Sequence, residues 1–289
     1  MNLTKQFFKY VSQNIFGLIG TSCYILADTY FIAQAAGTDG VTLLNLCLPI
    51  YNLIFAFGSM IGLGAATRYA ILQAQGEARA QRYFSNAILC ACLIAIPFML
   101  AGAFCPGTLL QLMGGDGDIV ALGLNYTRIF LLFTPFFMCN YILSAFVRND
   151  GDPSLAMVAT LSGSLFNVVF DYIFIFRFGW GLMGAAFATS LGTTIGGLMT
   201  VGYLLRRSHT LHLQRIKLSR KSMQLTARNI GYMVKLGSSA FVTELSIAFM
   251  MFLGNYVFIS HLGEDGVAAF SIACYFFPII FMIYDAIVL

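Results

Sequence analysis

The sequence predicts an all-α polytopic membrane protein, and three observations support this fold class. Apolar residues make up 59% of the 289 residues, charged residues make up 10%, and the mean hydropathy is +0.81. A soluble domain has roughly 45–50% apolar and about 25% charged residues. Apolar runs recur along the whole chain and reach the ~20 residues that a spanning helix needs, which excludes the shorter alternating strands of an outer-membrane barrel.

Eight spanning helices account for nearly the whole chain. We expect them at 7–34, 41–73, 83–113, 119–147, 154–176, 182–206, 226–261 and 266–289. Short segments rich in turn-forming residues separate them, such as "GTDG" at 37–40, "GGDGD" at 114–118 and "NDGDP" at 149–153. Pro97, Pro135 and Pro278 lie inside spans, where proline often bends a helix. No segment is long enough for a soluble domain.

The positions of lysine and arginine set the expected orientation. If the N-terminus is cytoplasmic, 13 of the 16 basic residues fall on that side, as the positive-inside rule requires. They are Lys5, Lys9, Arg68, Arg79, Arg82, Arg148, Arg206, Arg207, Arg215, Lys217, Arg220, Lys221 and Arg228. The net charge of +4 therefore reflects membrane topology and not nucleic-acid binding, and the basic segment between the sixth and seventh spans is a topological anchor within reach of anionic lipid.

Several kinds of site are not indicated by the sequence. The seven cysteines lie inside apolar spans and are expected to be small hydrophobic residues, not disulfides or metal ligands. Two of the three histidines, His209 and His212, lie in the basic segment, so a zinc site is not expected. The sequence has no phosphate-binding loop of the G-x-x-x-x-G-K-[ST] type. Any transport would therefore be driven by an ion gradient.

Two segments predict an internal repeat. "TYFIAQAAGTDGV" at 29–41 and "NYVFISHLGEDGV" at 255–267 align without gaps at an offset of 226 and share five residues. The repeat unit is then six helices, and parallel repeats of this kind are typical of transporters. We expect a six-helix lobe at 1–207, a basic cytoplasmic linker at 208–225 and the start of a second lobe at 226–289. The sequence resembles a truncated twelve-helix protein, with a genuine eight-helix protein as the alternative.

Four acidic residues lie inside the expected spans: Asp28, Asp171, Glu244 and Asp285. A carboxylate at the centre of a bilayer costs roughly 2.5–3.5 kcal/mol, so such residues face the bundle interior, a wet cavity or a partner. Asp28 and Asp171 both fall in the outer half of the membrane. Each acid is either part of a functional site or only hydrogen-bonded to a neighbouring helix.

Asp171 belongs to a polar cluster on the fifth span. Asn167 lies one helical turn before it in "NVVFD", so both side chains share one face. Thr189, in the small-residue segment "GAAFATS", adds a hydroxyl if the sixth span packs against the fifth. Oxygen ligands suit hard cations, and a buried carboxylate can also hold a proton. The cluster therefore predicts a site for Na⁺, with Asp28, Asn167 and Asp171 as ligands, or for H⁺.

At these residues the sequence resembles the multidrug and toxic compound extrusion (MATE) family of secondary transporters. The resemblance covers essentially the whole chain. It rests on "DTYFI" in the first span, "LPIYNLIFAFGSMIGLGAATRYA" in the second, "FVRNDGDPSLAM" between the fourth and fifth, "LFNVVFDYIFIF" in the fifth, "GLMGAAFATS" in the sixth and "TEL" in the seventh.

The resemblance implies a function and assigns residues to it. It implies two six-helix lobes and a cation site in the first lobe made by Asp28, Asn167, Asp171 and Thr189, with Glu244 as a second-lobe acid for coupling or substrate. The protein would be a monomer in the plasma (inner) membrane that exports lipophilic or cationic drugs by antiport. Its coupling ion would be Na⁺ or H⁺, with no other cofactor and no enzymatic activity. Glu244 matches the branch usually driven by sodium.

Two alternative functions remain at this point. A flippase for a lipid-linked or oligosaccharide precursor has a related architecture, but its cavity is typically basic, whereas the candidate cavity residues here are acidic. An intramembrane aspartyl protease also needs two carboxylates on different helices. The Gly-x-Gly-Asp motif of such proteases is missing from every expected helix.

Overall fold

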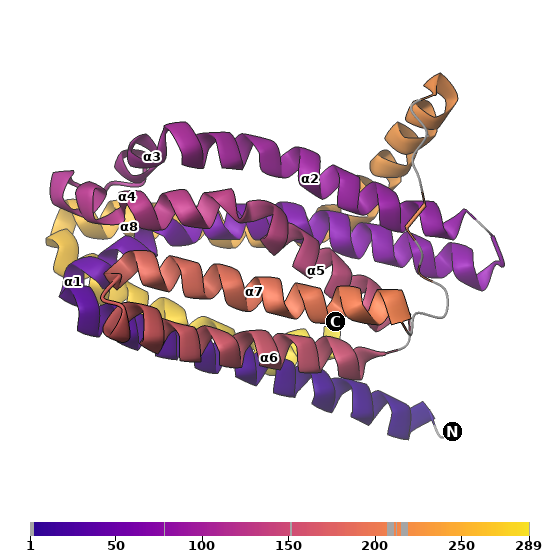
Figure 1. Ribbon diagram of the computed structural model, residues 1–289, viewed down its shortest axis with the longest axis horizontal. Helices are drawn as coiled ribbons and strands as arrows, with labels where there is room; N and C mark the ends of the chain where they lie inside the picture. Colours follow the sequence, from indigo (N-terminus) through magenta and orange to yellow (C-terminus); the bar gives the residue numbers. More distant parts are fainter. Residues whose placement is uncertain are drawn as a thin grey trace.

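The computed structural model describes residues 3–77, 79–150, 152–206, 211, 213–214 and 219–288. These form an elongated bundle of helices that run roughly along one long axis (Figure 1). The elements are α1 (Leu3–Ala74), α2 (Ala80–Phe104), α3 (Pro106–Leu112), α4 (Gly117–Leu132), α5 (Thr134–Asn149), α6 (Pro153–Tyr172), the π-helix η1 (Ile173–Arg177), α7 (Gly181–Arg206) and α8 (Arg220–Val288).

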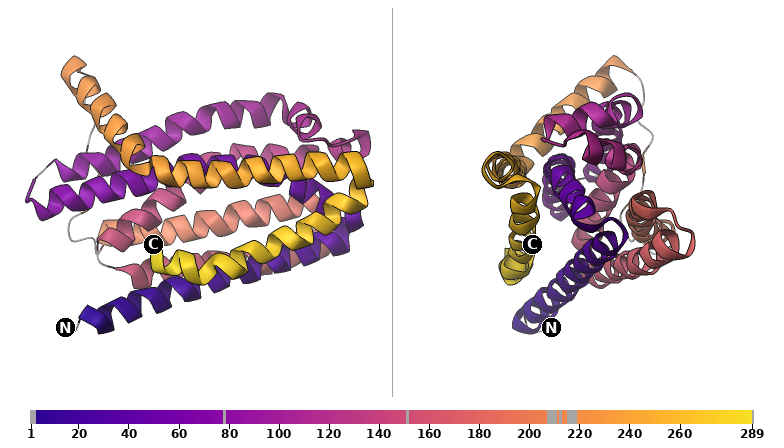
Figure 2. Two further views of the ribbon diagram at one scale, coloured as in Figure 1. Left: turned by 180° about the vertical axis from the view of Figure 1, so that it is seen from behind. Right: turned by 90° about the vertical axis from the view of Figure 1, so that its left-hand side faces the viewer.

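The two longest helices, α1 and α8, each turn back on themselves at a glycine. Gly37 (φ 63°, ψ −145°) interrupts α1 and Gly263 (φ 68°, ψ −157°) interrupts α8. Glycine tolerates a positive φ because it has no Cβ. Each helix is therefore two antiparallel rods joined by a sharp turn, as Figure 2 shows most clearly for α8.

This geometry supports the predicted repeat. Gly37 and Gly263 are equivalent at the offset of 226, and so are Gly40 and Gly266, which follow them. A Cβ on Gly40 would lie 2.9 Å from Cβ of Ala36, and a Cβ on Gly266 would lie 2.5 Å from Cβ of Leu262, the residue equivalent to Ala36. The two turns are thus alike in backbone conformation and in local packing.

The eight predicted spans each have a helical counterpart, with three corrections. The span 83–113 is two helices, α2 and α3, separated at Cys105, and the span 119–147 is α4 and α5, which bend by 46° at a break. The expected bend at Pro135 is confirmed, since this proline lies at the start of α5, whereas α2 continues through Pro97. The seventh helix begins at Arg220 and not at 226, because Ser219 Oγ accepts a hydrogen bond from the Ser222 backbone N–H at 3.3 Å.

Aspartate side chains fix the starts of α4 and α6. Asp116 Oδ1 accepts from the Ile119 backbone N–H at 2.9 Å, and Asp152 Oδ1 accepts from the Leu155 N–H at 3.2 Å. These bonds satisfy backbone donors that a helix leaves unpaired in its first turn. Both aspartates come from segments that the sequence predicted as turns.

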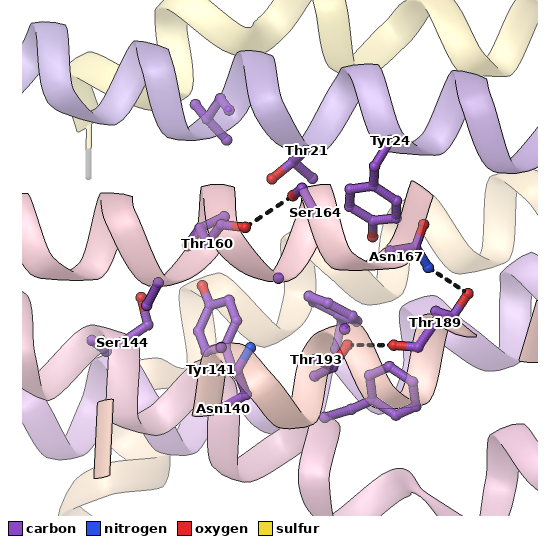
Figure 3. Close-up of a pocket in the computed structure, with 18 of the residues that line it drawn as sticks. Thr21, Tyr24, Asn140, Tyr141, Ser144, Thr160, Ser164, Asn167, Thr189 and Thr193 are labelled. Atoms are coloured by element: carbon purple, nitrogen blue, oxygen red, sulfur yellow. Dashed lines mark hydrogen bonds between the residues drawn. The ribbon is translucent and has the colours of Figure 1, made fainter. Parts of the chain in front are cut away.

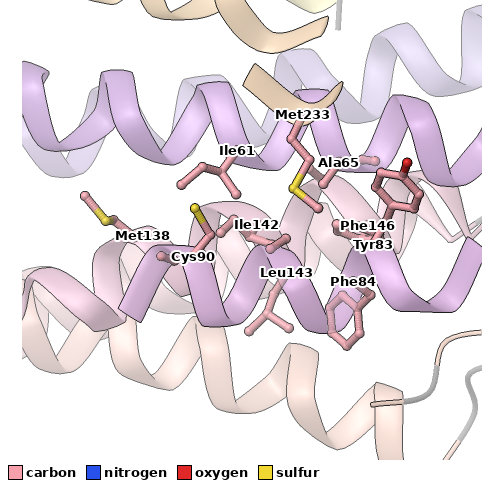
Figure 4. Close-up of a cluster of buried hydrophobic side chains, with 14 of the residues drawn as sticks. Ile61, Ala65, Tyr83, Phe84, Cys90, Met138, Ile142, Leu143, Phe146 and Met233 are labelled. Atoms are coloured by element: carbon pink, nitrogen blue, oxygen red, sulfur yellow. The ribbon is translucent and has the colours of Figure 1, made fainter. Parts of the chain in front are cut away.

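The main hydrophobic core lies between the second half of α1, α2 and α5. Figure 4 shows its centre, where Ile61, Phe84, Ile142 and Phe146 are all nearly inaccessible to solvent. Met233 of α8 reaches into the same core and is 1% exposed. The first half of α8 therefore shares the core of the helices that precede it.

Close backbone packing joins α8 to the second half of α1. A Cβ on Gly64 would overlap the Met233 carbonyl, and a Cβ on Gly237 would overlap the Met60 carbonyl. Nearer the opposite end of the same rods, Asn255 Nδ2 donates to the Asn45 carbonyl at 3.0 Å. Small residues allow such close approach of helices in membranes.

The described helices have the length and composition of a multi-pass membrane protein. Five of them are long and apolar enough to cross a membrane, and the bent pair α4 and α5 forms a sixth candidate. The turns at Gly37 and Gly263 lie at one end of the bundle, which we call the Gly37 end. We call the opposite end the Arg148 end. Among the described side chains, cysteines 23, 47, 90, 92, 105 and 139 are free thiols, and Cys274 lies outside the described side chains.

Candidate functional site

The predicted cluster of Asn167, Asp171 and Thr189 is present where α6 packs on α7. As drawn in Figure 3, Asn167 Nδ2 faces the Thr189 hydroxyl at 3.1 Å. Rotating the Asn167 amide by 180° gives it more hydrogen bonds. Nδ2 then donates to Asp171 Oδ2 at 3.1 Å, while the amide oxygen accepts from the backbone N–H and the hydroxyl of Thr189, each at 3.1 Å. We adopt the rotated amide, which links all three residues.

Glycine contacts bring α6 and α7 close enough for this link. A Cβ on Gly163 would lie 2.7 Å from the Gly192 carbonyl oxygen, and a Cβ on Gly192 would lie 2.7 Å from the Gly163 carbonyl oxygen. The two backbones are therefore in direct contact, one helical turn from Asn167. This confirms the expectation that the small-residue surface of the sixth span packs against the fifth.

Asp28 joins the cluster from the first half of α1. Its carboxyl group interacts with that of Asp171, which is completely buried. Among the described residues, Oδ1 of each aspartate is buried and has no hydrogen-bond partner. Two close carboxylates repel each other strongly where water is excluded, so a positive ion or a proton between them would stabilise the pair.

A cavity of about 290 Å³ opens beside this cluster, between α1, α5, α6 and α7 (Figure 3). Asn167 and Thr189 line it, whereas Asp28 and Asp171 lie beyond Asn167 and do not. The other lining groups include hydroxyls, amides and aromatic rings: Thr21, Tyr24, Tyr51, Phe55, Phe137, Asn140, Tyr141, Ser144, Thr160, Ser164 and Thr193. A ligand in this cavity would contact Asn167 directly and the aspartates through it.

The charge of the cavity differs from the sequence expectation. We expected acidic cavity walls, but the described lining residues include no carboxylate and one cationic side chain, Arg148. The reason is the direction of α6, which turns Asp171 into the packed interface with α1. The two acids are therefore a site adjacent to the cavity and not part of its wall.

Sequence reasoning missed most of the hydroxyl-bearing residues of the cavity, although a signal for them was present. Thr160, Ser164, Asn167 and Asp171 occur at spacings of four, three and four residues, which places them along one face of α6. Thr21, Tyr24 and Asp28 follow the same helical spacing on α1. A polar stripe on an otherwise apolar span would have predicted this lining.

One of the predicted acids lies outside the cluster, and another has no described side chain. Glu244 is partly buried on the first half of α8 and does not line the cavity. Asp285 lies in the second half of α8, outside the described side chains. No group of three or more His, Cys, Asp or Glu side chains suited to a metal ion occurs in the part of the chain that the structure describes. The candidate cation site therefore consists of two carboxylates, one amide and one hydroxyl.

Comparisons with curated proteins point to transporters. The multidrug export protein MepA of Staphylococcus aureus (strain MRSA252) is 25% identical over 265 residues, which cover 89% of this chain and 56% of MepA. MepA of Staphylococcus saprophyticus is 24% identical over 251 residues, covering 86% of this chain and 54% of that protein. The chain thus spans about half the length of the curated relatives it matches.

Solved structures share the fold. An inward-facing multidrug resistance MATE family transporter of the MOP superfamily has a TM-score of 0.79 and 25% identity, with 90% of this chain and 59% of that chain covered. The MATE multidrug transporter DinF-BH has a TM-score of 0.87 and 22% identity, with 97% and 62% covered. These names describe transporters and not enzymes, as the sequence predicted.

The MatE family model matches residues 14–173, which is more than half of the chain. The matched segment contains Asp28, Asn167 and Asp171, and the fold agrees with the solved transporters over nearly the whole chain. The chain therefore belongs to the MATE family.

Proposed function

We propose that this protein exports lipophilic or cationic compounds by antiport with Na⁺ or H⁺. The observation that carries this proposal is the buried pair Asp28 and Asp171, in which one oxygen of each carboxyl group has no hydrogen-bond partner among the described residues. Uncompensated carboxyl groups inside a membrane protein are costly and mark ion pathways or proton relays. The pair therefore offers a binding position for one cation.

The coupling ion would act on the contact between α1 and the α6–α7 pair. Na⁺ or H⁺ between Asp28 and Asp171 would remove their repulsion and favour the arrangement in which the two helices are close. Loss of the ion would favour separation of α1 from the α6–α7 pair. Since Asn167 connects Asp171 to the cavity, each state would present a different cavity wall, and a ligand can shift an equilibrium only through such a difference in affinity.

The cavity of about 290 Å³ is the proposed position for the transported compound on the side of the first lobe. Tyr24, Tyr51 and Phe137 provide aromatic surface, and Thr193 and Ser164 provide hydroxyls. Aromatic rings favour flat apolar molecules and can attract a cation over the ring face. MepA and DinF-BH are both named as multidrug transport proteins, which supports a multidrug substrate range for this chain.

Glu244 has a separate proposed role. It lies on α8, outside the cluster and outside the lining of the cavity, so it would contribute to coupling or substrate contact from the second lobe. We propose that the protein is a monomer in the plasma (inner) membrane with a cytoplasmic N-terminus, which places Arg148, Arg206 and Arg220 of the Arg148 end on the cytoplasmic side.

The first test measures ion binding and needs no transport. Purified protein in detergent is heated in NaCl or KCl of equal ionic strength, and at several pH values. A bound ion stabilises the folded state according to its concentration relative to its Kd, by roughly 2.7 kcal/mol at 100 times Kd. We expect Na⁺ or acidic pH to raise the melting temperature (Tm) of the wild type, and Asp28→Asn or Asp171→Asn to remove the increase.

The second test measures efflux of a fluorescent lipophilic cation from vesicles with an imposed Na⁺ or H⁺ gradient. Asp28→Asn and Asp171→Asn should reduce efflux at least tenfold, and Asn167→Leu should reduce it as well. Asp39→Asn is the matched control, because it makes the same change at an exposed carboxylate on α1. Wild-type efflux and ion stabilisation in both aspartate variants would refute the assignment of the site.

A further inference from the structure

A second cavity, of about 270 Å³, lies at the Arg148 end between the starts of α2 and α8. It shares no lining residue with the first cavity. Of its ten described lining residues, nine are polar or charged, and Leu225 is the exception. Such a composition favours a hydrated or charged ligand over a drug-like apolar molecule.

Two basic side chains face this cavity from opposite sides. Arg82 comes from α2 and Lys221 from α8, and neither forms an ion pair among the described residues. No described carboxylate lines the cavity. The described residues contain an ion pair between Arg79 and Glu77, at 3.7 Å. This pair is exposed and lies outside the second cavity. The cavity therefore concentrates positive charge without an internal counter-charge.

Buried amide groups complete the lining. Asn229 is 8% exposed and borders the cavity, and its side-chain amide has no hydrogen bond to the described residues. Asn86 is 3% exposed and accepts a hydrogen bond from the Thr226 hydroxyl through Oδ1 at 3.4 Å, which leaves its NH₂ group to donate elsewhere. Buried polar groups are nearly always hydrogen-bonded to protein, water or a ligand. These two side chains supply donors at the buried side of the cavity.

We propose that this cavity binds a phosphate group, carried by the headgroup of an anionic lipid or present as free phosphate. Arginine binds two phosphate oxygens through its planar guanidinium group, lysine adds a point charge, and amides add neutral donors. Basic residues close to the ends of spanning helices lie at the level of the lipid headgroups. The bound phosphate would connect α2 of the first lobe to α8.

The test measures lipid binding to the purified protein by native mass spectrometry. Phosphatidylglycerol is the anionic probe, phosphatidylcholine is the zwitterionic control, and inorganic phosphate is the soluble competitor. We expect phosphatidylglycerol to bind at least tenfold more tightly than phosphatidylcholine. Arg82→Gln and Lys221→Gln should each weaken this binding about tenfold, which corresponds to about 1.4 kcal/mol.

Matched variants separate a defined site from general attraction to a basic surface. Arg79→Gln and Arg228→Gln remove one positive charge each at the same end, outside the cavity, and should change binding less than twofold. Asn229→Leu keeps the charge and the approximate volume but removes a donor, so it should weaken binding several-fold. It also carries the test if the charge variants do not fold.

The outcomes are distinct. Displacement of bound phosphatidylglycerol by inorganic phosphate in the millimolar range supports the phosphate site with a soluble source. Binding of phosphatidylglycerol that inorganic phosphate does not displace supports the lipid source. Equal binding of phosphatidylcholine, unchanged binding in Arg82→Gln and Lys221→Gln, or equal losses in the control variants would overturn the proposal.

Discussion

Gly237→Ala should destabilise the contact between α8 and α1, because the added methyl group would overlap the main-chain carbonyl of Met60. Gly64→Ala should do the same from the other helix, where the methyl group would overlap the carbonyl of Met233. In both cases the obstacle is helix backbone, which cannot move aside as the end of a flexible side chain can. The two helices must therefore separate.

The size of the effect follows from two opposing terms. Overpacking by one methyl group typically costs about 1–3 kcal/mol, and a rigid obstacle places this contact at the upper end. Alanine is favoured over glycine inside a helix by about 1 kcal/mol, which offsets part of that cost. The net destabilisation is about 2 kcal/mol, and at roughly 2–4 °C per kcal/mol for a chain of this size it lowers Tm by about 4–8 °C.

Thermal unfolding of the purified protein in detergent measures this change. Gly231→Ala is the matched control, because Gly231 lies on the same helix and a Cβ there meets nothing within 4 Å. Its Tm should equal or exceed that of the wild type. The double variant Gly64→Ala/Gly237→Ala should lose less than the sum of the single variants, since one separation of the helices relieves both overlaps. Equal Tm values for Gly237→Ala and Gly231→Ala would refute the reasoning.

Three further predictions concern local structure. Gly37→Ala should lower the free energy of unfolding by about 1–3 kcal/mol. The whole loss would come from the positive φ, because a Cβ on Gly37 meets nothing within 4 Å. Gly117→Ala, at an equally open position inside a helix, should leave stability unchanged, and equal Tm values for the two variants would contradict this prediction. Asp116→Ala should cost about 1 kcal/mol by removing the cap on Ile119, whereas the nearby exposed Asp118→Ala should cost less in the same thermal assay. Asn255→Leu removes the hydrogen bond to the Asn45 carbonyl and should lower the free energy of unfolding by about 1 kcal/mol. A Tm equal to that of Tyr256→Phe, a neighbouring variant that keeps this bond, would argue against the bond.

The sequence predicts the helices well, because the membrane imposes their length and apolar composition. Each expected span has a counterpart, and the turns at Gly37 and Gly263 follow from residues that favour turns. The breaks within spans were less predictable. Pro135 indicates the bend between α4 and α5, but Pro97 leaves α2 intact, because the effect of a proline depends on the contacts around it.

The candidate site was predictable only in part. Asn167, Asp171 and Thr189 could be grouped, since helical spacing and a small-residue surface place them together. The contact between Asp28 and Asp171 depends on how α1 crosses α6, which no local pattern specifies. The same holds for the second cavity, where Arg82 and Lys221 are far apart in sequence and meet only through tertiary packing.

The repeat allows the position of Asp28 to be compared with its equivalent on α8. Position 254 is equivalent to Asp28 at the offset of 226, and it holds glycine. A Cβ on Gly254 would lie 2.5 Å from the ring of Phe270, so this ring would have to turn aside to admit even a methyl group. The two halves therefore share the turn that reverses the helix but differ at the point where the first half holds its acid. Under the proposed function, Asp28 would therefore have no equivalent acid on α8.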